Sequence, residues 1–401
     1  MAEPAPPIDL LSSRSFACGQ PHEQFRWLRA NDPVHWHAEP DGPGFWAVTR
    51  YDDVSAVGRD ARTYSSMPTI MIPDLTSLDT GEHTMMITTD PPRHTALRRI
   101  VARDFVPRAA RLLRPRIEDL ARRIVDGVAA GGSCDLVTDV AGLMPSYVIA
   151  EMLGIPHDDG VALYELTEAV HAIPGESDGP TGPEAVREMF AYAHDVWAHK
   201  RDHPSGDLAS TIVHASADGR ELDELDFQLF FMLLIDAGGD TTRNLVSGGM
   251  RALFDHPDEH ARLAADVDGL LPTAVEELLR WVSPVVYMRR TATCDAELGG
   301  RRIAAGEKVV VYYGAANRDP AVFTDPERFD LTRTPNEHVA FGGGGPHFCL
   351  GANVARIEIR ALLREVLTRL PDIAPDGPTT WLPSNFISGP KSLPVRFTPA
   401  A

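Results

Sequence analysis

The sequence predicts a mainly α-helical protein with small antiparallel β-sheets, an α+β architecture folded as a single compact unit. Apolar residues recur at intervals of three and four over about 90–280 and again over 350–370, as on the buried face of a helix. Short runs of β-branched and aromatic residues, bounded by glycine and proline, occupy about 1–65 and 282–345. Neither an internal repeat nor a low-complexity linker divides the 401 residues, so we expect one domain over 1–401.

The first elements are a short helix and a strand, and the middle of the chain is helical. A helix is expected at Glu23–Ala30 and a strand at Phe45–Thr49, which places a small sheet near the N-terminus. Helical periodicity then covers Ala109–Val128, Leu143–Leu153, Glu184–His199 and Asp223 to about Phe254. Between two of these helices, the segment Pro174–Pro183 cannot continue a helix, because proline lacks the amide donor. This segment is either a surface loop or a mobile lid over a pocket.

The last part of the chain returns to strands before one more helix. A second small sheet is expected from Ala296–Leu298, a Gly299-Gly300 turn, Arg302-Ile303 and the β-rich run Lys308–Tyr313. A final helix is expected from Leu350 to about Leu370. A proline-rich tail follows it, with a hairpin expected around Trp381–Phe386.

Composition and charge exclude several classes of function. Hydrophobic residues make up 43% and charged residues 24% of the chain, as in globular proteins. The formal net charge of -19 disfavours a nucleic-acid or anionic-membrane partner. No apolar run approaches the roughly 18–20 residues that span a bilayer, and no signal peptide is recognisable, so we expect a cytoplasmic protein, and a monomer. Four scattered cysteines without CxxC pairs predict neither a disulfide framework nor a zinc site.

The sharpest local signal is a glycine-rich loop that leads through a cysteine into a helical pattern. It runs from Phe341 through four glycines, Pro346, His347 and Phe348 to Cys349, Leu350 and Gly351. The glycines allow positive φ values and a close approach of the backbone to a flat ligand. A cysteine at a helix N-terminus favours the thiolate, which is a strong ligand for iron. A buried free cysteine or a phosphate loop is the alternative, but a Walker-type loop needs Gly-Lys-Ser/Thr, which is missing.

With this loop, the chain resembles the cytochrome P450 family of heme-thiolate monooxygenases over about residues 25–398. Family members carry Phe-x-x-Gly-x-x-x-Cys-x-Gly, with the aromatic residue seven positions before the ligand, whereas Phe341 stands eight before Cys349. The Phe-Gly-Gly-x-Gly spacing is similar to that of a bacterial subgroup acting on sterols and methyl-branched lipids. The resemblance implies heme b (iron protoporphyrin IX) as cofactor, with Cys349 as its metal ligand and Phe341 and Gly351 among the residues that bind it.

Two upstream motifs support the resemblance. Glu277 and Arg280 stand at i and i+3 on one helical face, a pairing that alone is common in helices. Followed by Pro326-Glu327-Arg328-Phe329 and the cysteine loop, it matches the family's Glu-x-x-Arg and Pro-Glu-Arg-Phe order. The resemblance implies that Glu277, Arg280 and Arg328 form a structural triad behind the heme.

The helix expected from Asp223 onwards has an unusual centre. Asp223 fits the N-cap position, and Ala237 is followed by two glycines, Asp240 and Thr241. Each glycine costs roughly 1 kcal/mol of helix stability relative to alanine, so a compensating role is expected. By resemblance, the turn from Ala237 opens a groove for O2, and Asp240 and Thr241 are the catalytic acid–alcohol pair that relays protons through water. Without the cysteine loop, a helix kink would explain the same residues.

Buried heme propionates require cationic or donor partners. By resemblance, His94, Arg98, Arg290 and His347 are expected to meet them. His94 and Arg98 are one helical turn apart, so they can act together. Taken separately, each of the four would more often be a surface cation.

The expected substrate is hydrophobic, because the segments expected to line the pocket are apolar and rich in methionine. A terpenoid, sterol or branched fatty-acyl compound is therefore predicted. The candidate residues are Met67, Ile70, Met71, Ile72, Leu75, Leu78, Met85, Met86, Ile87, Val285, Val286, Phe386 and Ile387.

The resemblance implies O2 as co-substrate and electrons from NAD(P)H through a ferredoxin reductase and a ferredoxin. Arginines gather in 93–116 against the single acid Asp104, and Arg356, Arg360 and Arg364 form a stripe at i, i+4 and i+8. Both features suit an acidic ferredoxin, with a solvated arginine face as the alternative. A peroxide-using relative would typically lack the acid–alcohol pair, and a heme sensor or carrier would need neither a relay nor a basic stripe.

Overall fold

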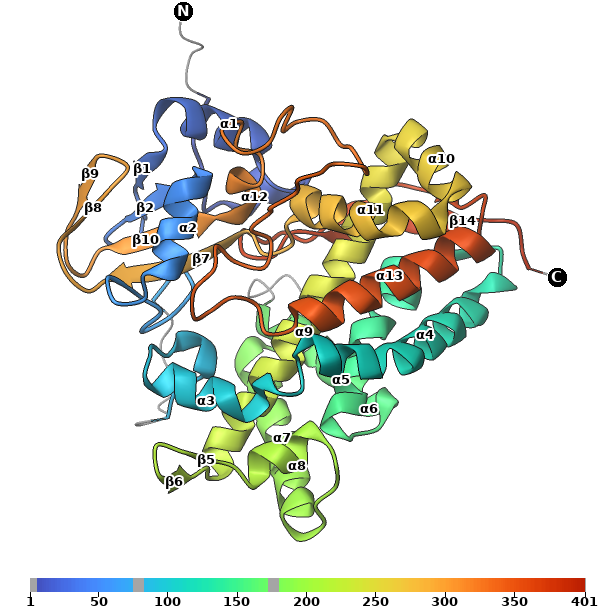
Figure 1. Cartoon of the computed structure of the whole chain (residues 1–401), viewed down its shortest axis with the longest axis horizontal. Helices are drawn as coiled ribbons and strands as arrows, with labels where there is room; N and C mark the ends of the chain where they lie inside the picture. Colours follow the sequence, from blue (N-terminus) through green and yellow to red (C-terminus); the bar gives the residue numbers. More distant parts are fainter. Residues whose placement is uncertain (1–5, 75–82, 172–179, 401) are drawn as a thin grey trace, which may run out of the picture.

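The computed structural model describes residues 6–74, 83–171 and 180–400, and it confirms the predicted fold class. Helices fill most of the molecule, and a smaller β-rich part lies at one side (Figure 1). The helices are α1 (His22–Asn31), α2 (Tyr51–Arg59), α3 (Arg93–Ala102), α4 (Pro107–Ala129), α5 (Leu143–Leu153), α6 (His157–His171), α7 (Gly182–Asp202), α8 (Leu208–Val213), α9 (Glu224–Asp255), α10 (Pro257–Ala265), α11 (Val267–Val282), α12 (Tyr313–Ala316) and α13 (Ala352–Arg369). Short turns of helix occur at η1 (Ser13–Phe16), η2 (Met86–Thr88) and η3 (Val137–Ala141).

A five-stranded sheet gathers strands from distant parts of the chain. Its order is β1 (Val34–His37), β2 (Phe45–Val48), β10 (Lys308–Tyr312), β7 (Tyr287–Ala292) and β3 (Tyr64–Ser65). The sequence predicted one sheet for the N-terminal strands and a second for the 308–312 run. This prediction was wrong, because both belong to the same sheet. β2 and β10 pair in parallel, whereas the other neighbours in this sheet are antiparallel. A parallel pair needs a crossover connection, which the helical middle of the chain provides.

Smaller sheets lie around this core. One has the order β11 (Ala374–Pro375), β14 (Pro394–Arg396) and β4 (Ser133–Asp135). The two-stranded ones are β5 (Ser216–Ala217) with β6 (Arg220–Glu221), β8 (Ala296–Leu298) with β9 (Arg301–Ile303), and β12 (Thr380–Trp381) with β13 (Pro390–Ser392). The Gly299-Gly300 turn is confirmed, with both φ angles positive. In the tail hairpin Trp381 pairs with Pro390, so Phe386 lies in its loop.

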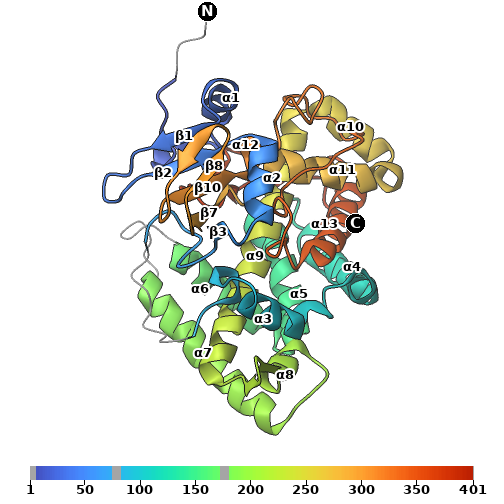
Figure 2. The same cartoon turned by 60° about the vertical axis from the view of Figure 1, so that its left-hand side comes forward.

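Helix α9 crosses the helical part of the molecule, as Figures 1 and 2 show from two sides. Asp223 is its N-cap, as predicted, and accepts a hydrogen bond from the Asp226 N–H at 3.0 Å. Helices α5, α7 and α11 all pack against α9, so most of its residues are buried. A helix surrounded in this way is apolar on several faces rather than on one stripe. Its central residues are thereby held at the middle of the fold.

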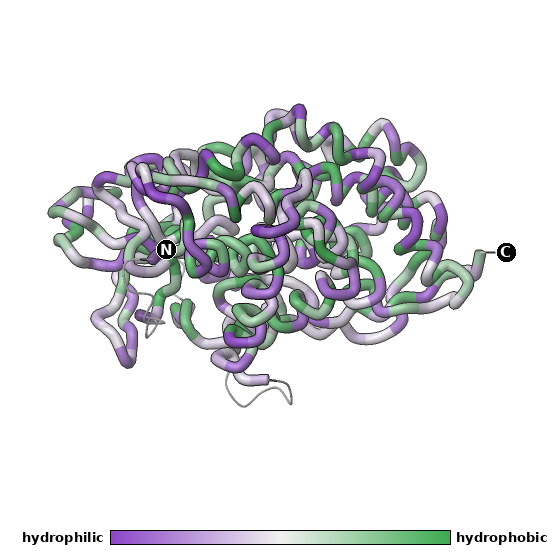
Figure 3. Tube along the Cα trace, turned by 90° about the horizontal axis from the view of Figure 1, so that it is seen from below, coloured by the Kyte–Doolittle hydropathy of each residue, from purple (hydrophilic) through white to green (hydrophobic). Residues whose placement is uncertain are grey.

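Hydrophobic and hydrophilic residues alternate along much of the chain (Figure 3), and the buried hydrophobic side chains gather in clusters inside the molecule. One core cluster fills the helical part, where α13 packs against α4 and α11. A second cluster around Phe25, Tyr287 and Tyr312 lies at the sheet. None of the helices in the described part of the chain combines the length and hydropathy that crossing a bilayer requires.

The segment Pro174–Pro183 lies largely outside the described residues. Its last residues are described: Thr181 caps α7 in a capping box with Glu184, and Gly182 and Pro183 already belong to that helix. The helix therefore begins earlier than expected, because proline is tolerated in the first turn, where its missing N–H costs no hydrogen bond.

Candidate active site

A cavity of about 430 Å³ lies between α9, the cysteine loop and the first turns of α13. Its lining brings together residues from α3 to α13 that are far apart in the sequence. It includes every residue predicted to bind the cofactor or relay protons: His94, Arg98, Ala237, Asp240, Thr241, Arg290, Phe341, His347, Cys349 and Gly351.

The cysteine loop is a tight turn held by its own backbone. The Cys349 N–H donates to the Phe341 carbonyl oxygen at 2.9 Å, which closes the loop. Gly342, Gly344 and Gly345 have φ angles of 100°, 100° and 78°, in the region that favours glycine. The additional residue between Phe341 and Cys349 is accommodated inside this turn. The Phe341 ring lies under the Arg356 guanidinium, 4.5 Å from the ring centre, so it is fixed although its spacing departs from the family pattern.

Two of the loop glycines are also required by contact with helix α2. A Cβ on Gly343 would lie 2.8 Å from the Ser55 Cα, and one on Gly345 would lie 2.3 Å from the Gly58 carbonyl oxygen. Either contact is closer than backbone atoms permit. The glycine run, predicted to let the backbone approach a flat ligand, thus serves the packing of the loop against α2, which no local pattern revealed.

The surroundings of the Cys349 sulfur suit a metal-bound thiolate. Burial raises the pKa of the Cys349 thiol above its ordinary value. The backbone N–H groups of Gly351 and Ala352 and the charges of Arg98 and Arg356 oppose this rise. These N–H groups are available because α13 begins at Ala352, two residues later than predicted, with Gly351 as its N-cap. A positive partner in the cavity, such as iron, would complete the stabilisation of a thiolate.

Four basic side chains converge on the cavity. The rings of His94 and His347 lie 4.1 Å apart between centres. Burial, with the charges of Arg98 and Arg290 nearby, lowers the pKa of His94 to about 4 and that of His347 to about 3. Burial also lowers the pKa of both arginines. The His94 Nδ1 has no hydrogen-bond partner among the described residues. A bound dianion would satisfy these groups, and the two propionates of heme fit them.

The centre of α9 presents Asp240 and Thr241 to the cavity. The Thr241 hydroxyl donates to the Ala237 carbonyl oxygen at 3.2 Å, the local bond of a helical threonine. Asp240 is only 7% exposed. Helix α9 remains continuous through Gly238 and Gly239, so neither glycine interrupts it. The acid and the alcohol therefore stand on one rigid element.

Two residues near this pair had no sequence signal. The Tyr164 hydroxyl of α6 donates to Asp240 Oδ1 at 2.7 Å. Glu358 of α13 also lines the cavity, and burial raises the pKa of its carboxyl to about 7 in spite of a hydrogen bond from Thr242. A tyrosine and a glutamate in amphipathic helices are ordinary, so only the packing of three helices identifies them.

The ion-pair cluster near the cysteine loop differs from the predicted triad in one member. Glu277 and Arg280 have fully buried side chains and form two hydrogen bonds of 2.8 Å. The third cation is Arg333, whose Nε lies 3.1 Å from Glu277 Oε2. Arg328 was the wrong assignment: its side chain is 64% exposed. It reaches the cluster through its backbone, because its carbonyl oxygen accepts a hydrogen bond from Arg280.

Most predicted substrate residues line the apolar wall: Ile70, Met71, Met85, Met86, Ile87, Val285, Phe386 and Ile387. The prediction that Val286 lines the pocket was wrong. Successive residues of an extended segment point to opposite sides, and Val286 packs into the core at the sheet. Ile72 belongs to the same core and Met67 is exposed. Leu75 and Leu78 lie outside the described residues. Helices α5, α6, α7 and α9 add residues that were not predicted, among them Val148, Ile149, Met152, Thr167, Val170, Met189 and Met232.

The arginine stripe on α13 is largely neutralised within the chain. Arg356 makes two hydrogen bonds of 2.8 Å to Glu276. Arg364 Nε lies 3.0 Å from an oxygen of Asp268. Since α11 provides both acids, this stripe carries less unpaired positive charge than the sequence indicated, and its use as a docking surface stays a prediction.

The arginines of the 93–116 stretch present a different surface. Arg99, Arg108, Arg111 and Arg114 are exposed. Large hydrophobic side chains are exposed in the same stretch and in the cysteine loop: Leu112 by 77%, Val106 by 45% and Phe348 by 41%. These segments are neighbours, because Asn353 of α13 donates to the Phe105 carbonyl oxygen and Arg98 donates to the Phe348 carbonyl oxygen. We call this set the basic face.

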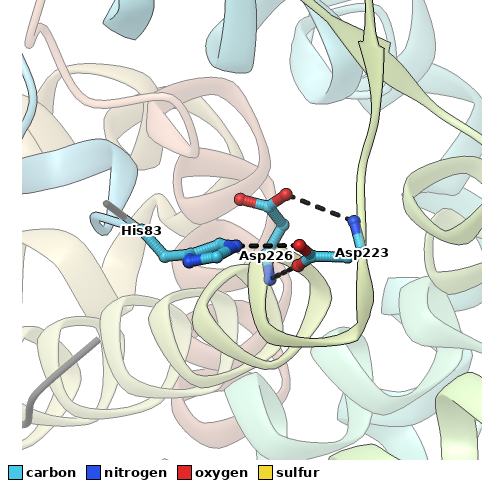
Figure 4. A group of neighbouring side chains, drawn as sticks. All are labelled: His83, Asp223 and Asp226. Carbon is cyan, nitrogen blue, oxygen red and sulfur yellow. Dashed lines mark hydrogen bonds and ion pairs between the residues drawn. The ribbon is translucent and has the colours of Figure 1, made fainter. Parts of the chain in front are cut away.

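His83, Asp223 and Asp226 lie close together and are a conceivable metal site (Figure 4). Asp223 and Asp226 cap α9 reciprocally, each accepting from the backbone N–H of the other. His83 Nε2 lies 2.8 Å from Asp223 Oδ2, and Arg220 pairs with both carboxylates. These interactions explain the group as a helix cap with its counter-ions.

Comparison with known proteins agrees with this geometry. A family model described as Cytochrome P450 matches residues 184–371. A methyl-branched lipid omega-hydroxylase of Mycobacterium tuberculosis is 41% identical over 387 residues, which cover 93% of this chain and 90% of that protein. A steroid C26-monooxygenase of Mycolicibacterium smegmatis is 37% identical, with 99% and 97% covered. The solved structure of a Mycobacterium marinum cytochrome P450 in complex with pseudoionone has a TM-score of 0.91 at 39% identity, with 99% and 100% covered.

Proposed function

The chain belongs to the cytochrome P450 family of heme-thiolate monooxygenases, and we propose that Cys349 is the iron ligand of its heme b. Bound heme supplies the iron at which O2 is reduced and one oxygen atom is inserted into a C–H bond. The proposal rests on one observation: the cysteine loop offers a sulfur with backbone N–H donors to the same cavity that Asp240 and Thr241 line. Phe341 and Gly351 contribute to this side of the cavity.

The basic side chains are proposed to hold the propionates. His94, Arg98, Arg290 and His347 lie together in a buried place, and burial lowers their pKa values. At the two histidines, repulsion by the charges of Arg98 and Arg290 lowers the pKa further. Carboxylates would turn this repulsion into attraction. Ala237 lines the cavity beside the relay pair and is proposed to contact the cofactor.

Asp240 and Thr241 are proposed to deliver the protons that oxygen activation consumes. A carboxyl group can hold a proton, and the neighbouring hydroxyl can pass it on through water. Thr241→Ala is expected to send reducing equivalents to hydrogen peroxide instead of product, measured as the ratio of peroxide to NAD(P)H consumed. Retained coupling to product would show that this hydroxyl is not part of the relay.

The substrate is proposed to be a methyl-branched lipid, a sterol or a terpenoid. The wall formed by Met71, Met86, Ile87, Val285, Phe386 and Ile387 has few polar groups to recognise a polar ligand, and methionines adapt to irregular shapes. Two relatives are named for methyl-branched lipids and steroids. Titration of a lipid panel against the heme absorption band tests the class, because an entering ligand shifts that band. Shifts with polar aromatic or peptide ligands alone would contradict it.

The electron donor is proposed to be an acidic ferredoxin that docks on the basic face and is reduced by a ferredoxin reductase with NAD(P)H. Exposed arginines around apolar side chains suit a partner of opposite charge. The double variant Arg108→Glu, Arg111→Glu is expected to slow reduction about tenfold at low salt. Arg302→Glu, an exposed arginine on the β8–β9 hairpin, serves as control. Equal rates and equal salt dependence in both variants would exclude this docking surface.

The ligand assignment is tested by Cys349→Ser. The reduced variant under carbon monoxide is expected to lose the long-wavelength absorption band that marks thiolate ligation, because serine does not provide a thiolate. Cys294→Ser, at an exposed free cysteine, is the matched control and should keep the band. A thiolate band that persists in Cys349→Ser would overturn the proposal.

A further inference from the structure

A buried tyrosine holds the acid of the proposed relay pair. The Tyr164 hydroxyl donates to Asp240 Oδ1 at 2.7 Å, and both residues are only 7% exposed. Tyr164 lies in α6 and Asp240 at the centre of α9, so the bond joins two helices. Such a bond, formed away from water, fixes the direction of the carboxylate more strongly than one at the surface.

The shape of α9 fits this tyrosine. A Cβ on Gly239 would lie 2.6 Å from the Tyr164 ring, so only glycine leaves room for the ring there. A Cβ on the neighbouring Gly238 would make only ordinary contacts with Ile149. The Arg243 guanidinium, one turn further along α9, lies 5.1 Å from the centre of the Tyr164 ring. Gly239, which lowers the stability of the helix, thus makes room for the Tyr164 ring, and the hydroxyl of this ring donates to Asp240.

The same tyrosine is linked to the substrate side of the cavity. Thr167 lines the cavity from α6, and its hydroxyl donates to the Tyr164 carbonyl oxygen at 2.7 Å. Val170, one further turn along, also lines the cavity. A contiguous path therefore leads from the cavity wall through Thr167 and Tyr164 to Asp240.

We propose that Tyr164 is a positioning residue that orients Asp240 for proton delivery and ties this orientation to the packing of α6 against the cavity. This inference rests on the proposed relay role of Asp240. Tyr164 only donates a hydrogen bond and transfers no proton. Without the Tyr164 hydroxyl, Asp240 loses one of the bonds that fix its orientation, and a proton donor that is misplaced by about 1 Å can lose up to about two orders of magnitude in rate.

The test variant is Tyr164→Phe, which removes the hydroxyl and keeps the ring on Gly239. Its matched control is Tyr192→Phe: the Tyr192 hydroxyl donates to Asp159 at 2.6 Å and also joins two helices, but Asp159, unlike Asp240, does not line the cavity. Asp240→Asn tests the relay itself. Each holoenzyme is assayed for the ratio of peroxide to product and for the solvent isotope effect on turnover. Melting temperatures of the single variants and of Tyr164→Phe, Asp240→Asn form a double-mutant cycle that does not depend on activity.

We expect Tyr164→Phe to lower coupled product formation about tenfold and to raise the solvent isotope effect, while Tyr192→Phe changes neither. The shifts in melting temperature should be less than additive, because both single variants act on the same bond: Tyr164→Phe removes its donor, and Asp240→Asn replaces its charged acceptor by a weaker amide oxygen. Uncoupling in Asp240→Asn beside unchanged coupling in Tyr164→Phe would overturn this inference alone. Full coupling in Asp240→Asn would overturn the relay, and the role of Tyr164 with it.

Discussion

The cysteine loop and the apolar wall of the cavity are built by different means. The loop is closed by the Cys349 backbone bond and seated on α2 through its glycines. Near it, Glu277 receives hydrogen bonds from Arg280, Arg333 and Asn336. The apolar wall is formed by flexible methionine and aliphatic side chains, whose contacts have no preferred direction.

The difference assigns a task to each region. Hydrogen bonds and ion pairs set distances and angles, so the loop region can hold a cofactor in one position. Dispersion contacts set only the volume, so the apolar wall can adapt to hydrophobic ligands of irregular shape. Helix α6 connects the apolar wall with the proposed relay, since it contributes Thr167 to the wall and the Tyr164 hydroxyl to Asp240.

The largest effect is expected from breaking the buried ion pair of the loop region. Glu277→Gln leaves Arg280 with an uncompensated charge at a fully buried site, which costs about 3–5 kcal/mol of unfolding free energy. Denaturant unfolding of the holoenzyme measures the loss. The matched control is Asp255→Asn, which breaks the Arg251–Asp255 pair at the surface and should cost about 0.5 kcal/mol or less. Equal losses of unfolding free energy in the two variants would mean that burial of the Glu277–Arg280 pair does not add to its effect on stability.

A smaller effect, with a defined pH dependence, is expected at Glu358. Burial raises the pKa of Glu358 from 4.5 to about 7, so the folded protein keeps a proton that the unfolded chain releases. Its contribution to stability is complete below about pH 4.5 and is lost as the pH rises through 7, a fall of about 3 kcal/mol in total.

Glu358→Gln, which cannot ionise, should reduce this fall and be more stable than the native protein at pH 8, as measured by unfolding at a series of pH values. The control is Glu365→Gln on the same helix. The Glu365 carboxylate is less buried than that of Glu358, and it pairs with Arg369. It should keep the native pH dependence. A Glu358→Gln profile parallel to the native one would contradict the assignment.

The smallest effect on stability, and a selective effect on binding, is expected in the apolar wall. Met86→Leu conserves volume and should change unfolding free energy by less than about 1.5 kcal/mol. Because Met86 lines the cavity, the variant should nevertheless change the order of affinities in a series of branched lipids, measured by spectral titration. Met144→Leu, at a fully buried methionine of the core outside the lining, is the control and should leave that order unchanged. An unchanged order in Met86→Leu would mean that this wall does not select ligands.

Features that depend on neighbouring residues could be predicted from the sequence. Asp223 caps α9, Glu277 pairs with Arg280 across one turn, and the glycine loop carries Cys349 to the start of a helix, all as expected. In each case the partners stand within a few positions of one another, so local backbone geometry brings them together. The predicted heme and relay residues also lie around one cavity, although that expectation came from the family resemblance.

The sequence by itself determined the mainly helical fold, the family and the cysteine loop, because periodicity, caps and motifs are local signals. Only the tertiary structure decided that β2 pairs with β10, that Arg333 rather than Arg328 meets Glu277, that Val286 faces the core, and that Tyr164 holds Asp240. These contacts join residues from distant parts of the chain or depend on which way a side chain points. Their formation depends on how whole elements pack, and no short pattern in the sequence records that packing.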